Sequence, residues 1–197
     1  MPRTSGDTIE RLFQAATALI GEHGYAATTV DEIVEKAGVA KGTVYYHFKS
    51  KSELLEALLE DGLRRLAAGF RADIAEATTA TEALSVLVHA ELLYVSQYQA
   101  FAKLVMSEMW RVDRDWRDSL RTLREEYVQV IAEVIETGMS TGEFSPDLHV
   151  QTAASALFGM LASAALDWLV FSPQERLEDV YARLNVLTLN AVGARSK

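Results

Sequence analysis

The chain of 197 residues contains no cysteine and only three prolines. Without cysteine it can form neither a disulfide nor a thiolate zinc site, and this fits a protein of the reducing cytoplasm. The prolines are Pro2, Pro146 and Pro173, and no stretch sustains an alternation of apolar and polar residues. Both features favour helices over strands.

Targeting and membrane signals are also missing. The N-terminal segment MPRTSGDTIERLF lacks the basic-then-apolar layout of a secretory signal peptide. The longest weakly polar run, residues 153–171, is rich in alanine, serine and glycine and carries Asp167 near one end. Such a run predicts a buried helix rather than a membrane span, so we expect no membrane partner.

Catalytic and cofactor motifs are absent as well: there is no G-x-S-x-G, H-E-x-x-H, P-loop or dinucleotide-binding glycine pattern. The four histidines are scattered. His89 and Glu91 could contribute to a site, although a solvated or core pair is the commoner arrangement. We therefore predict no catalytic residue, no metal and no cofactor, while an enzyme assembled from distant residues stays formally open.

Negative charge is plentiful but unevenly distributed. The formal net charge is −9, yet residues 1–51 contain six basic and six acidic side chains and are neutral as a group. The segment KGTVYYHFKSK, Lys41 to Lys51, contains three lysines and no carboxylate. This change in composition predicts a domain boundary after residue 51.

Capping residues and apolar stripes predict an all-α fold of about nine helices. Thr29 and Glu32 form a capping box that opens the second helix, and Ser50 with Glu53 forms another before the fourth. Ser145-Pro146 and Ser172-Pro173 each place a capping residue before a first-turn proline, and Ser172 with Glu175 repeats the box. The predicted ranges are 7–23, 30–37, 41–48, a long helix from Ser50 to Ile74, 82–98, 100–111, 114–140, 146–171 and 173–192.

The second and third predicted helices, joined by a tight turn, have the geometry of a helix-turn-helix. On the third helix Val44 and Phe48 share the inward side, and Thr43 and Tyr46 project opposite them. The polar and aromatic side chains suit phosphates, sugars and base edges. Gly42 weakens the helix by roughly 1 kcal/mol relative to alanine, which makes sense if the backbone approaches a phosphate.

The lysines support the same hypothesis. Lys51 opposes the helix dipole in the first turn of the fourth helix, a poor choice for stability but a good one for holding a phosphate. Lys49 adds to that position, and Thr29 offers its hydroxyl. A lysine cluster is usually a solvated surface, and a YYHF run on a helix is usually core. The coincidence of basic cluster, helix spacing and exposed aromatics favours nucleic acid.

The segment TTVDEIVEKAGVAKGTVYYHFKSKSELLEALL, Thr28 to Leu59, resembles the N-terminal signature of the tetracycline-repressor (TetR) family of bacterial regulators. The resemblance covers roughly residues 7 to 60. It implies that the third helix enters the major groove and that two further residues, Thr29 and Lys51, bind phosphates. The positions that match the family's groove-reading residues are Lys41, Gly42, Thr43, Tyr45, Tyr46 and His47.

Two positions depart from the family pattern. Val34 stands where alanine is usual, at the contact between the two helices, and Ala40 stands where a capping serine is common. The missing cap costs about 1 kcal/mol and one possible phosphate contact. These departures affect fine geometry and sequence preference rather than DNA binding itself.

The remainder, residues 52–197, resembles the family only in architecture, a helical domain that binds a small molecule and dimerises. The predicted eighth helix is rich in small residues that permit close helix approach, and the ninth has one apolar stripe. Together they predict a four-helix homodimer interface, although both could simply complete the monomer core. The residues are Ala153, Ala154, Ala156, Gly159, Ala162, Ser163, Ala164 and Ala165, and then Leu177, Val180, Leu184, Leu187 and Ala191.

Soft and flat side chains suit a largely apolar effector pocket of adaptable shape. At helical spacing such residues are more often core. The candidates are Tyr94, Tyr98, Phe101, Met106, Trp110, Tyr127 and Phe158.

The sequence therefore predicts a homodimeric repressor that binds a pseudo-palindromic double-stranded DNA operator and is released by a small molecule. An activator on the same scaffold stays open. So does a small-molecule carrier or enzyme whose helix-turn-helix is only structural. The sequence specifies neither the effector nor the operator.

Overall fold

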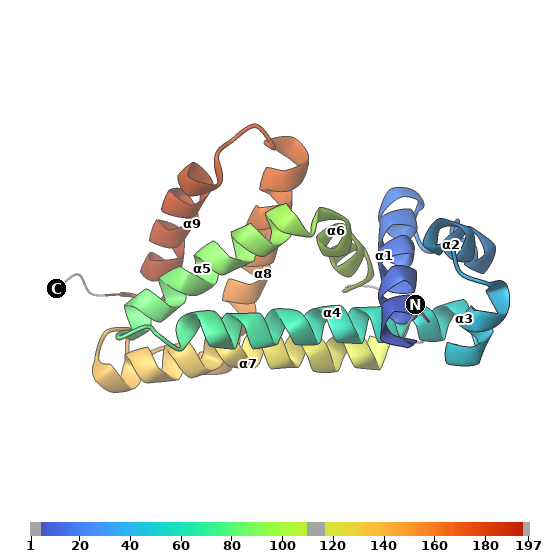
Figure 1. Ribbon diagram of the computed structural model, residues 1–197. Coiled ribbons are helices and arrows are strands. Elements are labelled where there is room, and N and C mark those ends of the chain that lie inside the picture. Colours follow the sequence, from blue (N-terminus) through green and yellow to red (C-terminus); the bar gives the residue numbers. More distant parts are fainter. Residues whose placement is uncertain (1–4, 110–116, 195–197) are drawn as a thin grey trace. The chain divides into compact units, whose positions relative to one another are not determined.

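The computed structural model describes residues 5–109 and 117–194 (Figure 1). The described residues form nine α-helices and no strand, which confirms the all-α prediction. The helices are α1 Ser5–His23, α2 Val30–Ala37, α3 Lys41–His47, α4 Lys51–Ile74, α5 Ala80–Gln97, α6 Gln99–Met109, α7 Arg117–Thr141, α8 Val150–Phe171 and α9 Leu177–Ala191.

The chain packs into two compact units, and α4 and α7 each contribute residues to both. The first unit comprises the described parts of residues 1–63 and 100–122, and the second comprises those of 64–99 and 123–197. These units are defined by packing. The functional boundary predicted after residue 51 therefore stays a prediction.

The first unit holds the helix-turn-helix. α1 contributes Leu12, Ala16 and Ile20 to its core, and α2 packs against α1. The Arg11 guanidinium donates to the carbonyls of Ala37 and Gly38 at the end of α2, so α1 also caps its neighbour.

In the second unit α5 packs against both α8 and α9. Within the α9 stripe predicted from the sequence, Val180 and Leu184 are buried, whereas Leu187 is 57% exposed. Ala191 is exposed too. The helical spacing places these residues on one side of α9, and the dimer interface predicted for this stripe stays a prediction.

The start predicted for α8 at residue 146 was wrong. α8 begins at Val150, and the imidazole of His149 accepts a hydrogen bond from the backbone N–H of Thr152 at 3.3 Å. Ser145 precedes a turn at residues 146 and 147 instead, and its own N–H donates to the carbonyl of Val192 at 3.0 Å. This hydrogen bond joins Ser145 to the C-terminal end of α9, and the chain does not become helical until Val150.

The start predicted for α9 at residue 173 fails in a similar way. Ser172 ends α8, and its carbonyl accepts from the N–H of Glu175 at 3.0 Å, so a turn replaces the expected capping box. Trp168 fixes that turn by donating from its indole N–H to the Glu175 carbonyl at 3.0 Å. The other predicted boundaries that fall on described residues lie within three residues of the observed ones. Predicted helix residues 110, 111 and 114–116 fall outside the described ranges.

α8 is, among the described residues, the one helix whose length and composition would allow it to cross a membrane. It packs against α5 and α9, and one side of it is buried. Core helices pass the same test of length and composition, and the buried side of α8 packs within the second unit.

Candidate nucleic-acid interface

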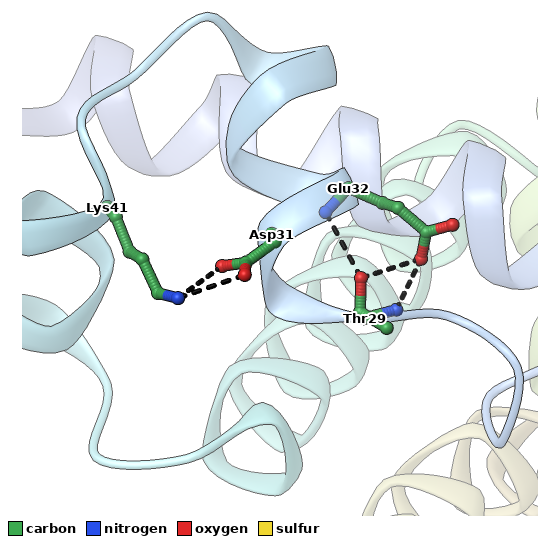
Figure 2. Close-up of polar contacts among 4 residues, drawn as sticks. All are labelled: Thr29, Asp31, Glu32 and Lys41. Atoms are coloured by element: carbon green, nitrogen blue, oxygen red, sulfur yellow. Dashed lines mark hydrogen bonds and ion pairs between the residues drawn. The ribbon is translucent and has the colours of Figure 1, made fainter.

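A complete capping box opens α2 (Figure 2). The Thr29 hydroxyl accepts from the N–H of Glu32 at 3.2 Å, and the Glu32 carboxylate accepts from the Thr29 N–H at 2.7 Å. The Thr29 hydroxyl also donates to that carboxylate, and these bonds lower the pKa of Glu32. The capping box predicted from the sequence is confirmed. Thr29 is exposed, so the N-terminal end of α2 lies at the protein surface.

The turn between α2 and α3 depends on Gly38. Its φ of 60° is left-handed, and its N–H returns to the carbonyl of Glu35. After the turn α3 begins at Lys41 behind Ala40, which makes no side-chain capping bond. The predicted loss of a cap at Ala40 is therefore confirmed.

The two sides of α3 differ in burial, as its sequence predicts. Val44 is 1% exposed and Phe48, which caps the helix, is 7% exposed, whereas Tyr46 is 85% exposed. Tyr45 is exposed, and Thr43 and His47 are half-buried. An aromatic side chain that the fold leaves outside is available to a partner, although contact with DNA stays a prediction.

Gly42 is not required by packing within the protein. A Cβ built at this position would meet nothing within 4 Å, and its φ lies outside the left-handed region. Neither packing nor backbone conformation in the described fold therefore requires glycine at position 42. This agrees with the hypothesis that the backbone there comes close to an external group.

Lys41 makes an ion pair across the helix-turn-helix (Figure 2). Its ammonium lies 2.6 Å from one carboxylate oxygen of Asp31 and 2.9 Å from the other, and this partner raises the pKa of Lys41. Both side chains are exposed. The pairing holds Lys41 beside the start of α2, where a phosphate would compete with Asp31 for it.

The other two lysines of the predicted site differ in their surroundings. Lys49 is exposed, and its backbone N–H donates to the Glu53 carboxylate at 2.7 Å. Ser50 caps α4 as predicted, by accepting from the Glu53 N–H at 3.1 Å. Lys51 is half-buried, and its ammonium donates to the carbonyls of Tyr25 and Thr28.

Two of the predicted effector residues meet in the core of the second unit. The Tyr127 and Phe158 rings pack edge to face, with their centroids 5.3 Å apart. The Phe70 ring also packs on Tyr127, at 4.9 Å between the two centroids. The Tyr127 hydroxyl donates to the Glu91 carboxyl at 2.7 Å. Burial raises the pKa of Glu91 and that of Tyr127.

Arg124, one turn before Tyr127, brings a cation to the same cluster. Its guanidinium lies 5.1 Å from the Phe158 ring centroid and donates to the Ser155 hydroxyl at 2.6 Å. Its Nε is buried and has no hydrogen-bond partner among the described residues. The sequence reasoning missed Arg124 and Phe70. Their spacing from Tyr127 and Phe158 gives no signal that the tertiary fold brings them together.

Among the described residues, the other effector candidates make different ring contacts or lie in the first unit. Tyr94 and Tyr98 pair with each other at 4.7 Å, and Tyr98 is 53% exposed. Phe101 lies in the first unit, where its ring covers Gly62 so closely that an added Cβ would lie 2.2 Å from it. Met106 is half-buried in that unit, and Trp110 lies outside the described residues. His89 and Glu91 do not share a site either, since His89 faces Glu178 at the surface.

Two family models match the chain. Residues 12–58 match the bacterial regulatory proteins of the tetR family, and residues 77–169 match the tetracyclin repressor-like C-terminal domain. The HTH-type transcriptional repressor KstR2 of Mycolicibacterium smegmatis is 30% identical over 142 residues, which cover 72% of this chain and 69% of that protein. The chain belongs to the TetR family. It is thus a DNA-binding transcriptional regulator, and the carrier and enzyme alternatives are disfavoured.

Two further proteins match over nearly the whole chain. The fatty acid metabolism regulator protein of Bacillus subtilis (strain 168) is 26% identical over 188 residues, 95% of this chain and 95% of that protein. The crystal structure of the regulator FadR from Bacillus subtilis in complex with stearoyl-CoA superimposes with a TM-score of 0.83. It covers 95% of this chain and 99% of its own at 24% identity, which is a likeness of fold.

Proposed function

We propose that this TetR-family regulator is a repressor that binds a pseudo-palindromic operator as a homodimer and leaves it when a small molecule binds. The observation that supports DNA reading most strongly is the exposed face of α3, with Tyr46 at its centre. In this proposal α3 enters the major groove while Thr29, Lys49 and Lys51 bind phosphates. The groove-facing residues are Lys41, Gly42, Thr43, Tyr45, Tyr46 and His47.

The homodimer forms through α8 and α9 in this proposal. Four large apolar side chains are exposed on these two helices although their opposite sides are buried. Val170 and Phe171 come from α8, at 50% and 75% exposure, and Val186 and Leu187 from α9, both at 57%. Exposed large apolar side chains on two packed helices are compatible with a protein interface, and a two-fold partner would supply the second reading helix that an operator needs.

Selection from genomic DNA tests the operator claim. Purified protein is mixed with fragmented genomic DNA at about 0.15 M salt, and the captured fragments are sequenced, with Tyr46→Ala as the matched control. We expect the wild type to enrich a short inverted repeat and the variant to lose that enrichment. Equal enrichment by both proteins, or capture without sequence preference, would contradict the proposal.

The effector is proposed to be largely apolar and to bind at the cluster of Phe70, Tyr127 and Phe158 in the second unit. Three packed rings offer apolar contact, and Arg124 and Glu91 offer polar groups at their edge. A related fold is known with stearoyl-CoA bound, so long-chain acyl-CoA is the first class to test. The cytoplasm, where such thioesters and DNA coexist, is the proposed location.

Operator release tests the effector claim. Stearoyl-CoA, free coenzyme A and stearate are each titrated into the protein–operator complex and release is followed by fluorescence anisotropy. We expect stearoyl-CoA to release the operator and coenzyme A alone to leave it bound. Phe158→Ala should weaken the response to stearoyl-CoA. Release by none of the three compounds would remove acyl-CoA as the effector class and leave the operator claim intact.

A further inference from the structure

An acidic residue, Asp31, lies beside the helix proposed to read DNA. It is the second residue of α2, and its carboxylate oxygens lie 2.6 and 2.9 Å from the ammonium of Lys41, the first residue of α3. The pair therefore joins the first turns of the two helices, and Figure 2 shows the two side chains directed toward each other. Both side chains are more than half exposed, so the pair lies open to a partner.

Helix stability gives only part of the reason for an acid at this position. A carboxylate near the start of a helix is favourable, because the N–H groups there are partly positive. Glu32 already supplies such a carboxylate, and it accepts from both the N–H and the hydroxyl of Thr29. Asp31 is directed to Lys41 instead. A carboxylate on a surface that approaches DNA is repelled by the phosphates, and a contact with a base would offset that repulsion.

The pair matches the edge that a C·G base pair presents in the major groove. Cytosine offers its N4 amino group as a donor, and guanine offers two neighbouring acceptors, O6 and N7. The amino group and O6 lie about 3 Å apart because they are hydrogen-bonded to each other. A carboxylate acceptor and an ammonium donor already in contact have the complementary arrangement. Thymine presents a single acceptor beside a methyl group, which suits an ammonium less well.

We propose that Asp31 and Lys41 together read one C·G base pair in each operator half-site, with the Asp31 carboxylate accepting from the cytosine amino group and the Lys41 ammonium donating to guanine. This inference rests on the proposed DNA-binding function. It makes Asp31 a specificity-determining residue, whereas the sequence predicted base reading by α3 alone.

Asparagine at position 31 separates base reading from charge. Its amide keeps an acceptor oxygen and adds two donors, so it suits adenine as well as cytosine. Loss of the negative charge also reduces the repulsion from phosphates. Asp31→Asn should therefore bind the operator at least as tightly as the wild type, while it discriminates less at one base pair of each half-site.

A set of operators in which every base pair is changed in turn measures this preference. The wild type, Asp31→Asn and Lys41→Gln are each titrated with every operator at about 0.15 M salt. We expect the wild type to prefer C·G at one position of each half-site by roughly tenfold, and both variants to lose most of that preference at the same position.

Lys49→Gln is the matched control, because Lys49 is an exposed lysine proposed to bind a phosphate. It should weaken binding to all operators by a similar factor and leave the base preferences unchanged. Thermal unfolding of every variant checks that the fold is kept.

Three results would overturn the proposal. A wild type with no C·G preference at any position is the first. The second is a uniform loss of affinity in Asp31→Asn and Lys41→Gln with unchanged base preferences, which would mean that the ion pair only fixes α2 against α3. Loss of preference at different positions in the two variants is the third, since the side chains would then contact separate base pairs. Failure of the wild type to select any operator would instead count against the DNA-binding function.

Discussion

The side chains of the helix-turn-helix have partners of two kinds. Val44 and Phe48 are held by the core, and Lys41 and Lys51 are held by polar groups of the first unit. Tyr46, in contrast, is 85% exposed. At the scale of single residues, the two lysines predicted to bind phosphates differ in their surroundings, because Lys49 is exposed and Lys51 is half-buried.

Asp31→Asn should strengthen DNA binding. It removes an acid beside the proposed phosphate contacts and releases Lys41 from its ion pair. Exposed ion pairs are weak, so the gain in operator affinity should be modest, roughly two- to fivefold. Titration of the operator at about 0.15 M salt measures it. Asp147→Asn, the same charge change on an exposed acid of the second unit, is the control and should have less effect. A weaker complex for Asp31→Asn would show that the Asp31 pairing orients Lys41 for DNA.

How far the sequence could predict single residues depends on the range of their contacts. The box of Thr29 and Glu32 is local, so its pattern was sufficient to predict it. The burial of Glu91 depends on Tyr127, 36 residues later, and no pattern near either residue announces it. Lys51 is a similar case, because its carbonyl partners lie 23 and 26 residues away.

Among the helices, α3 is short and carries a glycine in its first turn, and its N-cap makes no side-chain bond. Isolated helices of this length are not stable, so α3 depends on packing of Val44 and on the neighbouring turn. The sequence predicted the apolar spacing of this helix correctly. The two serine-proline starts were wrong, because backbone contacts from distant segments decide whether a capping pattern opens a helix or a turn.

Gly42→Ala should stabilise the protein and weaken its DNA binding. Alanine stabilises a helix interior by up to about 1 kcal/mol relative to glycine, and the space at this position is open. A methyl group on a backbone that approaches a phosphate should cost about tenfold in operator affinity. Thermal unfolding and operator titration are measured on the same preparation. Higher stability with unchanged operator affinity would contradict the close approach of the Gly42 backbone to a phosphate.

Glu143 is a remote cap for the start of α5. Its carboxylate accepts from the N–H groups of Ala80 and Thr81 at 3.2 and 2.9 Å, and from two threonine hydroxyls. The backbone donation from Thr81 is the main reason that the pKa of Glu143 falls from 4.5 to about 2.

Glu143→Gln should lower the free energy of unfolding by about 1 kcal/mol at pH 7, the usual cost of a lost helix cap. A depressed carboxyl pKa stabilises the fold above the unfolded value and loses that effect as the pH falls toward the folded value. The difference between wild type and variant should therefore shrink as the pH falls from 4.5 toward 2. Urea unfolding at pH 7, 4, 3 and 2 measures it. A difference that stays constant down to pH 2 would contradict this assignment.

At the scale of the molecule, two features favour a second copy of the chain. Apolar residues of α8 and α9 are exposed, and each chain has a single reading helix. The all-α class and the order of the helices could be predicted from capping and periodicity. Which of the small residues of α8 face outward could not, because a helix rich in alanine presents similar surfaces on every side. The structure buries Ala154, Ala162 and Ala165 and exposes Ala156 and Ser163.

Phe171→Glu combined with Leu187→Glu should convert the dimer to a monomer. Burying two unpaired carboxylates in an apolar interface is strongly unfavourable, so dimer dissociation should become at least about a hundredfold easier. Light scattering after size-exclusion chromatography measures the mass, and Tyr98→Glu, a change at the exposed aromatic residue that follows α5, is the control. A dimer that persists in the double variant would place the interface elsewhere.

The proposed function depends on DNA reading by the exposed face of α3, and substitution of Tyr46 tests this most directly. Operator affinity is measured for the wild type, Tyr46→Ala and Tyr98→Ala, a control that removes a second exposed tyrosine outside the helix-turn-helix. Loss of one base-reading side chain typically costs about 1–3 kcal/mol, so Tyr46→Ala should bind the operator roughly ten- to a hundredfold more weakly. Its unfolding and its binding to unrelated DNA should not change. Operator affinity equal to that of the wild type would contradict the assignment of α3 as the reading helix.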